Sequence, residues 1–184
     1  MASITPRLPI RSGALLLSLC ALLSSMGAAA QEGVEAAPPP APDWDTIAFE
    51  VKSWGAPRWR WQYTPQYGGV WIEAVSEDGA ALGDYTLEFH PLEADAERYI
   101  ALENIMRQLP DPAPDSAECE QMMTDMAYGT VRLTRAATTT EIAWNSGCMD
   151  DDYAAFVGLL READRMVSEW GRAVPVSRTE PAPR

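Results

Sequence analysis

Residues 58–63 read R-W-R-W-Q-Y, and this alternation of aromatic and polar side chains is the clearest fold signal in the chain. The hexapeptide lies within residues 53–71, which hold four of the seven tryptophans. Successive side chains of a β-strand point to opposite faces of the sheet, so the stretch predicts a strand with unlike faces. One face carries Trp59, Trp61 and Tyr63, and the other carries Arg58, Arg60 and Gln62.

The aromatic face of this strand has two interpretations, and the opposite face adds a third. Buried in a core, each tryptophan or tyrosine contributes about 2–3 kcal/mol of transfer free energy. Exposed, the same row forms a surface that binds sugars or peptides. In the third interpretation Arg58 and Arg60 are the functional residues, binding an acidic partner or pairing with acids on neighbouring strands. The predicted binding residues are therefore Arg58, Trp59, Arg60, Trp61 and Tyr63.

The same two-residue period recurs elsewhere along the chain. Pro91 predicts that the fourth strand does not continue as a central strand, because proline cannot donate a backbone hydrogen bond. Among the predicted strands, residues 118–125 show the weakest alternation of apolar and polar side chains. Strands are predicted over residues 46–53, 58–64, 68–75, 85–89, 118–125, 130–135 and 139–144.

Two segments change to a helical period. Apolar residues at helical spacing predict a helix over residues 93–109, which Pro110 ends. A second apolar stripe predicts a helix over residues 150–170. Three consecutive aspartates, 150–152, stand where an N-cap belongs, and Gly171 stands where a C-cap glycine belongs.

These elements predict an α+β fold, an antiparallel sheet of about six to seven strands with two amphipathic helices. Residues 67–72 (Y-G-G-V-W-I) resemble residues 128–133 (Y-G-T-V-R-L), and each is followed by another strand and a helix. This match raises the alternative that the domain consists of two β-β-β-α halves. The α+β class does not depend on that duplication.

The two ends of the chain differ in composition from its middle. Residues 1–30 combine Arg7 and Arg11 with a short apolar run and an A-A-A end, which predicts a cleaved secretory signal peptide rather than a retained membrane anchor. Residues 31–43 and 172–184 are rich in proline and alanine and predict a disordered leader and a disordered tail. A single folded domain is expected over residues 44–171.

The charge of the chain limits its partners. The net charge is −13, and it becomes −15 without residues 1–30, which hold two arginines and no acid. Such a surface repels nucleic acid and anionic headgroups, so no nucleic-acid partner is expected. The short apolar run is removed with the signal peptide, so no transmembrane segment is expected after cleavage. Lys52 is the single lysine among 14 basic residues, a bias typical of GC-rich bacterial genomes. With the signal peptide, this bias predicts a periplasmic or secreted bacterial protein.

Two cysteines remain once residues 1–30 are removed, Cys119 and Cys148. In an oxidising compartment an isolated pair is typical of a disulfide, and a loop of this length gives it about 3–4 kcal/mol of stabilisation. The alternative is a redox or metal-binding pair. The wide spacing is unlike a C-x-x-C motif and favours the disulfide.

Few residues carry a pattern typical of catalysis. His90 is the only histidine and stands at a predicted strand end, where a surface or capping role competes with that of a general base. Asp150, Asp151 and Asp152 near Asn145 lack the spacing of a calcium loop. The sequence contains no phosphate-binding loop and no dinucleotide or zinc-protease motif. No catalytic residue, metal or cofactor is therefore predicted.

The sequence favours a binding protein over an enzyme. We expect a non-catalytic periplasmic binding or accessory module whose partner is another envelope protein or a cell-wall polymer. The alternative is a small carboxylate-dependent hydrolase of the envelope, for which the 27 acidic residues supply many carboxyl groups but no selective signal.

Overall fold

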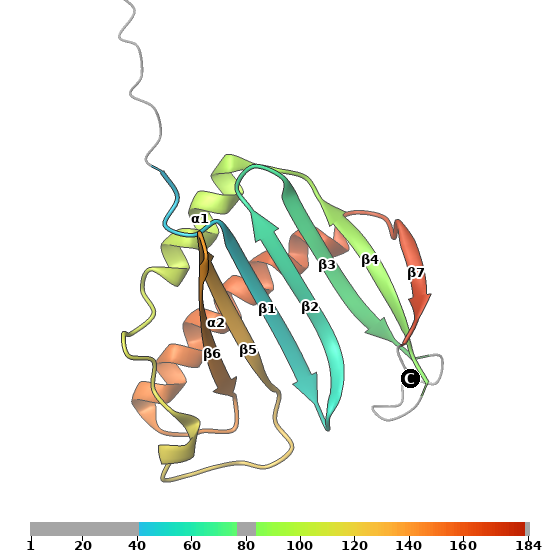
Figure 1. Ribbon diagram of the computed structural model, residues 1–184. Helices are drawn as coiled ribbons and strands as arrows, with labels where there is room; N and C mark the ends of the chain where they lie inside the picture. The colour runs from blue at the N-terminus through green and yellow to red at the C-terminus, as the bar shows by residue number, and fades with distance from the viewer. Residues whose placement is uncertain (1–40, 77–83, 183–184) are drawn as a thin grey trace, which may run out of the picture. The chain divides into compact units, whose positions relative to one another are not determined.

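A computed structural model describes residues 41–76 and 84–182, and all of these belong to one compact unit. The fold is α+β, as predicted: a seven-stranded antiparallel sheet and two α-helices (Figure 1). The strands are β1 Thr46–Ser53, β2 Ala56–Thr64, β3 Gly68–Val75, β4 Thr86–Leu92, β5 Tyr128–Arg135, β6 Thr138–Asn145 and β7 Arg178–Pro181. The helices are α1 Ala96–Met106 and α2 Asp151–Arg172, with a short 3₁₀ turn η1 at Ser116–Glu118.

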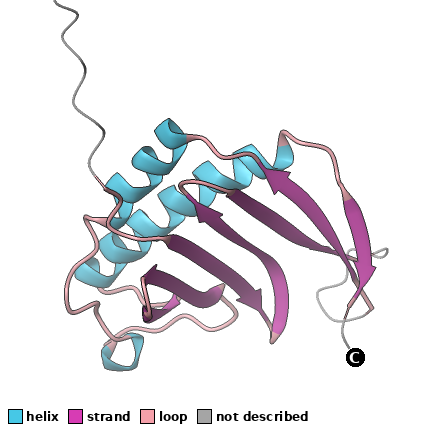
Figure 2. Cartoon of the chain, turned by 45° about the horizontal axis from the view of Figure 1, so that its top comes forward, coloured by secondary structure: helices cyan, strands magenta, loops and turns pink. Residues whose placement is uncertain are grey.

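The sheet has the order β6-β5-β1-β2-β3-β4-β7. The first four strands form a meander, and the β5–β6 hairpin joins its other edge through pairing of β5 with β1. Both helices lie against one face of the sheet, which we call the inner face (Figures 1 and 2). The opposite, outer face carries no helix in the part of the chain that the structure describes.

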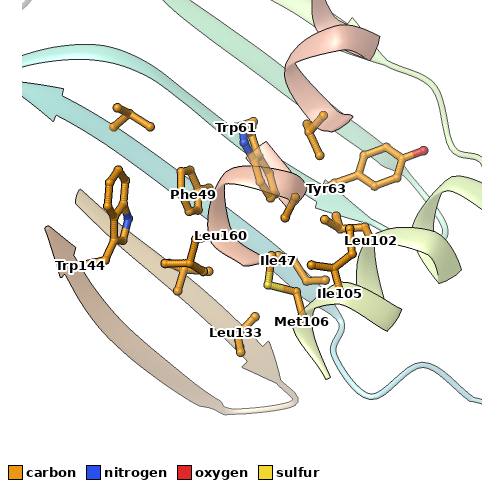
Figure 3. Close-up of a cluster of buried hydrophobic side chains, with 14 of the residues drawn as sticks. Ile47, Phe49, Trp61, Tyr63, Leu102, Ile105, Met106, Leu133, Trp144 and Leu160 are labelled. Atoms are coloured by element: carbon orange, nitrogen blue, oxygen red, sulfur yellow. The ribbon is translucent and has the colours of Figure 1, made fainter. Parts of the chain in front are cut away.

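The core lies between the inner face and the helices (Figure 3). The Phe49 ring on β1 stacks between Trp61 of β2 and Trp144 of β6, with centroid distances of 5.5 and 5.3 Å. Offset aromatic packing of this kind adds about 0.5–1.5 kcal/mol per pair to the burial itself. A row of stacked aromatic side chains therefore runs across the inner face from β2 through β1 to the edge strand β6.

The two helix N-termini are held differently. The Asp95 carboxylate caps α1 by accepting the backbone N–H groups of Glu97 and Arg98. Asp150 occupies the N-cap position of α2 without capping it. Its carboxylate instead accepts the N–H groups of Glu120 and Gln121, so it ties the disulfide loop to α2.

Gly171 does not end α2 as predicted, because the helix continues to Arg172. The glycine lies inside the last turn against Trp71, where an added Cβ would stand 2.6 Å from the indole. Its role is to permit this close approach between helix and sheet.

Three further predictions differ from the structure. β4 ends at Leu92 rather than at residue 89. Pro91 nevertheless does not lie in a central stretch, because β7 pairs with β4 only as far as Phe89 and leaves one side of Pro91 without a strand partner. Residues 118–125 form no strand beyond a single bridge from Met122 to Cys148. The second half of the proposed duplication therefore lacks its first strand, and β1 takes the place beside β5.

The described parts of the two chain ends are more ordered than predicted. The segment 172–184, expected to be disordered, contains β7. Ser177 and Ala182 donate backbone hydrogen bonds to Phe89 on β4 and to Tyr85 just before it. Asp43, the last residue of the predicted leader, pairs with Arg107 of the loop after α1. The predicted signal peptide and most of the leader lie outside the described residues.

Candidate functional site

Strand β2 carries the predicted binding residues, and the structure separates them. Trp61 and Tyr63 face inward with 1% and 0% of their surface exposed. Trp59 is half-buried, and Arg60 is exposed on the outer face. The aromatic row is therefore part of the core, and β2 presents no exposed aromatic platform.

Arg58 does not follow the predicted alternation. A bulge between Val51 and Lys52 leaves Arg58 without a partner on β1, since Val51 pairs with Trp59 and Lys52 with Pro57. A bulge re-aims side chains locally, so the register assigns Arg60 but not Arg58 to the outer face. Neither arginine forms an ion pair with any residue that the structure describes.

The inner face of β2 is joined to α2 by a hydrogen-bond network that the sequence analysis missed. The Trp59 indole N–H donates to both Asp164 oxygens, at 2.9 and 3.1 Å, and the Trp61 indole donates to Oδ1 at 2.9 Å. One turn later, Ser168 accepts the Trp71 indole N–H at 3.1 Å and lies 3.4 Å from Asp164 Oδ1. Three tryptophans on two strands therefore share two polar residues of one helix.

The position of Asp164 in the sequence could have shown that its carboxyl group lies on the buried side of α2. It lies four residues after Leu160 and three before Val167, both buried in the predicted apolar stripe. A carboxylate on the buried side of a helix needs hydrogen-bond donors, and indoles are donors only. The sequence could have indicated that Asp164 receives tryptophan N–H groups, although not which ones.

The electrostatics of Asp164 fit an anchor rather than a general base. Burial raises the pKa of its carboxyl group, and the bonds from Trp61, Trp59 and Ser168 and the charge of Arg172 lower it by less. Its oxygens already accept these donors, so a substrate proton would have to displace an indole. The geometry therefore favours a structural clamp between β2 and α2.

The outer face of the sheet carries a second arrangement. Across neighbouring strands one row reads Glu50, Arg60, Ile72, Phe89 and Arg178. Glu50 pairs with Lys52 at 2.9 Å, while the Arg178 guanidinium lies 3.9 Å from the centroid of the Phe89 ring. Two arginines therefore bracket an apolar pair in a single row.

An apolar cluster surrounds that row. Ile72, Leu87 and Phe89 are buried although they stand on the outer face, and Val70, Ala74 and Tyr85 pack against them. A hollow of about 110 Å³ beside the cluster is bordered by Arg60 and Leu87 among others. We call Arg60, Ile72, Leu87, Phe89 and Arg178 the outer patch.

The other residues considered for catalysis or metal binding form contacts within the fold. His90 is buried, its Nδ1 donates to the Val174 carbonyl at 2.9 Å, and its ring contacts the Trp71 indole edge-on. Cys119 and Cys148 form a disulfide with Cα atoms 5.8 Å apart, which confirms the predicted pairing. Asp150 lies near both sulfur atoms, but the disulfide uses them and leaves no thiolate for a metal.

No family model matches the chain, and no curated protein or solved structure is significantly similar to it. Within residues 41–76 and 84–182, no helix is both long enough and apolar enough to cross a membrane.

Proposed function

We propose that this protein is an exported, non-catalytic binding module of the bacterial envelope, and that its outer patch binds an acidic segment of another envelope protein. Export is supported by the signal-peptide pattern of residues 1–30 and by the disulfide between Cys119 and Cys148. A periplasmic location follows from this proposal.

The observation that carries the binding proposal is the row in which Arg60 and Arg178 bracket Ile72 and Phe89. Arg60 is exposed and forms no ion pair within the described chain, in a protein with a net charge of −13. An unpaired guanidinium beside apolar side chains is typical of the centre of a protein interface, where arginine is enriched. An acidic partner side chain would complete the ion pair.

The composition of the outer patch favours a protein over a cell-wall polymer. Sugars stack on flat, exposed aromatic rings, and the aromatic residues of β2 face the core instead. The Phe89 ring is already covered by Arg178. Arg178 pairs with Glu180 at 3.0 Å, so Arg60 is the cation of the patch without an ionic partner among the described residues. Aliphatic side chains beside such a cation suit the mixed side chains of a peptide segment better than a sugar ring.

Site-specific photocrosslinking in living cells tests this proposal. A photoreactive amino acid at exposed Gln62, on the outer face beside Arg60, should yield one defined protein adduct. The same group at Gln108, which is exposed beyond the end of α1, should not. Mass spectrometry of the adduct should identify an acidic segment in the partner.

Charge reversal supplies the matched control. Arg60→Glu should abolish the Gln62 adduct, whereas Arg132→Glu, on the same face of β5 but paired with Glu141, should leave it intact. An adduct that survives Arg60→Glu, or the absence of any adduct from Gln62, would contradict the proposal. Testing Arg58→Glu separately shows whether the arginine at the bulge belongs to the same surface.

The alternative of a carboxylate hydrolase has no comparable support. Among the described carboxyl groups, that of Asp164 has its pKa raised by burial. Its oxygens already accept hydrogen bonds from Trp59 and Trp61. The His90 Nδ1 donates to a backbone carbonyl, and its ring contacts Trp71 edge-on. We therefore propose no reaction.

A further inference from the structure

Two adjacent cavities lie on the inner side of the molecule, away from the outer patch. The first has a volume of about 260 Å³ and the second about 300 Å³. They share four lining residues, Met126, Ser146, Val157 and Arg161, so they adjoin each other between α2 and the loop that precedes β5, and we call the two together the cleft. Together they fall within the range of small-molecule binding sites.

The walls of this cleft are apolar. Phe49, Val51 and Trp144 line the first cavity, and Met123 and Met149 line the second. Figure 3 shows Trp144 beside Phe49 and Leu160 at the end of the core that borders the first cavity. Methionine side chains are flexible and adapt to apolar ligands of different shape, and Met123 and Met149 are about half exposed at the rim.

The outer wall of the cleft is fixed in place by covalent and backbone links. The disulfide between Cys119 and Cys148 joins the loop to the start of α2. Met123 N–H donates to the Gly147 carbonyl at 2.8 Å, and Met149 N–H to the Gln121 carbonyl at 2.9 Å. The cleft is therefore preformed, which lowers the entropic cost of binding a ligand.

Two donor groups at the cleft have no partner among the described residues. Arg161 is exposed at the cleft, borders both cavities and forms no ion pair with a described residue. The Trp144 indole N–H is buried and has no hydrogen-bond partner in the described chain, a costly state for a buried donor. The Ser146 hydroxyl donates to the Ala127 carbonyl, and the Asp164 oxygens accept from Trp59 and Trp61. Arg161 therefore has no ionic partner, and the Trp144 indole N–H has no acceptor, among the described residues.

We infer that the cleft binds an amphipathic anion with a single alkyl chain, such as a fatty acid. The chain lies along the apolar walls, and the carboxylate pairs with Arg161. A carboxylate supplies acceptor oxygens for the Arg161 guanidinium, and its charge complements this cation, which borders both cavities. This binding is independent of the outer patch and of the protein partner proposed for it.

Isothermal titration calorimetry of the purified protein with dodecanoate, below its micellar concentration, tests the inference. We expect one saturable site per chain. Arg161→Gln should weaken dodecanoate binding about tenfold, the loss expected for one charge-assisted hydrogen bond. Arg165→Gln is the matched control, because Arg165 lies one turn further along α2, pairs with Glu169 and borders neither cavity.

Two further variants test where dodecanoate binds. Met126→Trp should fill the shared wall and abolish binding, with an unchanged melting temperature showing that the variant is folded. Arg60→Glu should leave dodecanoate binding unchanged, since Arg60 lies on the outer face. Absence of a saturable site, an Arg161→Gln variant that binds like wild type, or equally tight binding of dodecyltrimethylammonium would overturn the inference.

Discussion

The two faces of strand β2 are built from neighbouring residues and obey different rules. On the inner face Trp61 is 1% exposed, and its indole N–H reaches a carboxylate on α2. On the outer face Arg60 is exposed and has no ionic partner within the described chain. The buried face of the strand stabilises the fold, whereas the exposed face contributes few contacts to it, so substitutions one residue apart should have unlike effects on stability.

The largest effect is expected for Trp61→Ala. Removing this indole leaves a cavity beside Phe49 and deprives Asp164 of a donor, at a cost of about 3–5 kcal/mol in the free energy of unfolding. Urea denaturation measures this difference. Gln62→Ala, the next residue on the exposed face, should change the same quantity by less than about 0.5 kcal/mol. Similar costs for the two variants would contradict the assignment of Trp61 to the core and of Gln62 to the exposed face.

A smaller loss is expected for Asp164→Ala. The substitution leaves the Trp59 and Trp61 indole N–H groups without their acceptor, and each unsatisfied buried donor costs about 1–3 kcal/mol. Because Trp59 is only half-buried, water can replace part of its bond, so we expect about 2–3 kcal/mol in total. Glu162→Ala, exposed on the same helix, is the control for the urea measurement. An Asp164→Ala variant as stable as this control would show that the network is not a clamp.

The raised pKa of Asp164 should make the stability of the protein depend on pH. Burial raises the pKa of folded Asp164 above its ordinary value of 3.8, so the folded protein holds this proton more tightly than the unfolded chain does. The resulting penalty is fully present above the folded-state pKa and is relieved as the pH falls through it toward 3.8. Relative to Asp164→Asn, wild type should therefore gain stability as the pH is lowered from neutral toward 4. A stability difference that is flat or of opposite slope would contradict the assignment.

The smallest effect on stability is expected on the outer face. Arg60→Ala removes no ion pair with a described residue, so its free energy of unfolding should match wild type within about 0.5 kcal/mol. If Arg60 belongs to the proposed interface, the same variant should weaken capture of the partner in the photocrosslinking assay. A destabilised Arg60→Ala protein would assign this residue to the fold rather than to binding.

Local pattern predicted much of the architecture because it depends on neighbouring residues. The period of two placed Trp61 and Tyr63 on one face of a strand, and the apolar stripe placed Tyr153 and Leu160 on one face of α2. The pattern did not show the bulge at Arg58, which arises from how β1 and β2 pair. It also missed β7, because Arg178–Pro181 has no apolar alternation and is held by backbone bonds to β4.

Periodicity and the two cysteines outside residues 1–30 were enough to predict the α+β class, the two unlike faces of β2 and the pairing of Cys119 with Cys148. The packing of the helices then assigned the aromatic face of β2 to the core. Only the tertiary structure decided that Asp164 receives the indoles of a strand about a hundred residues earlier. It alone placed Arg178 beside Phe89 and Arg161 at an apolar cleft. Such contacts depend on where a helix or an edge strand lies on the sheet, and long-range packing sets that position.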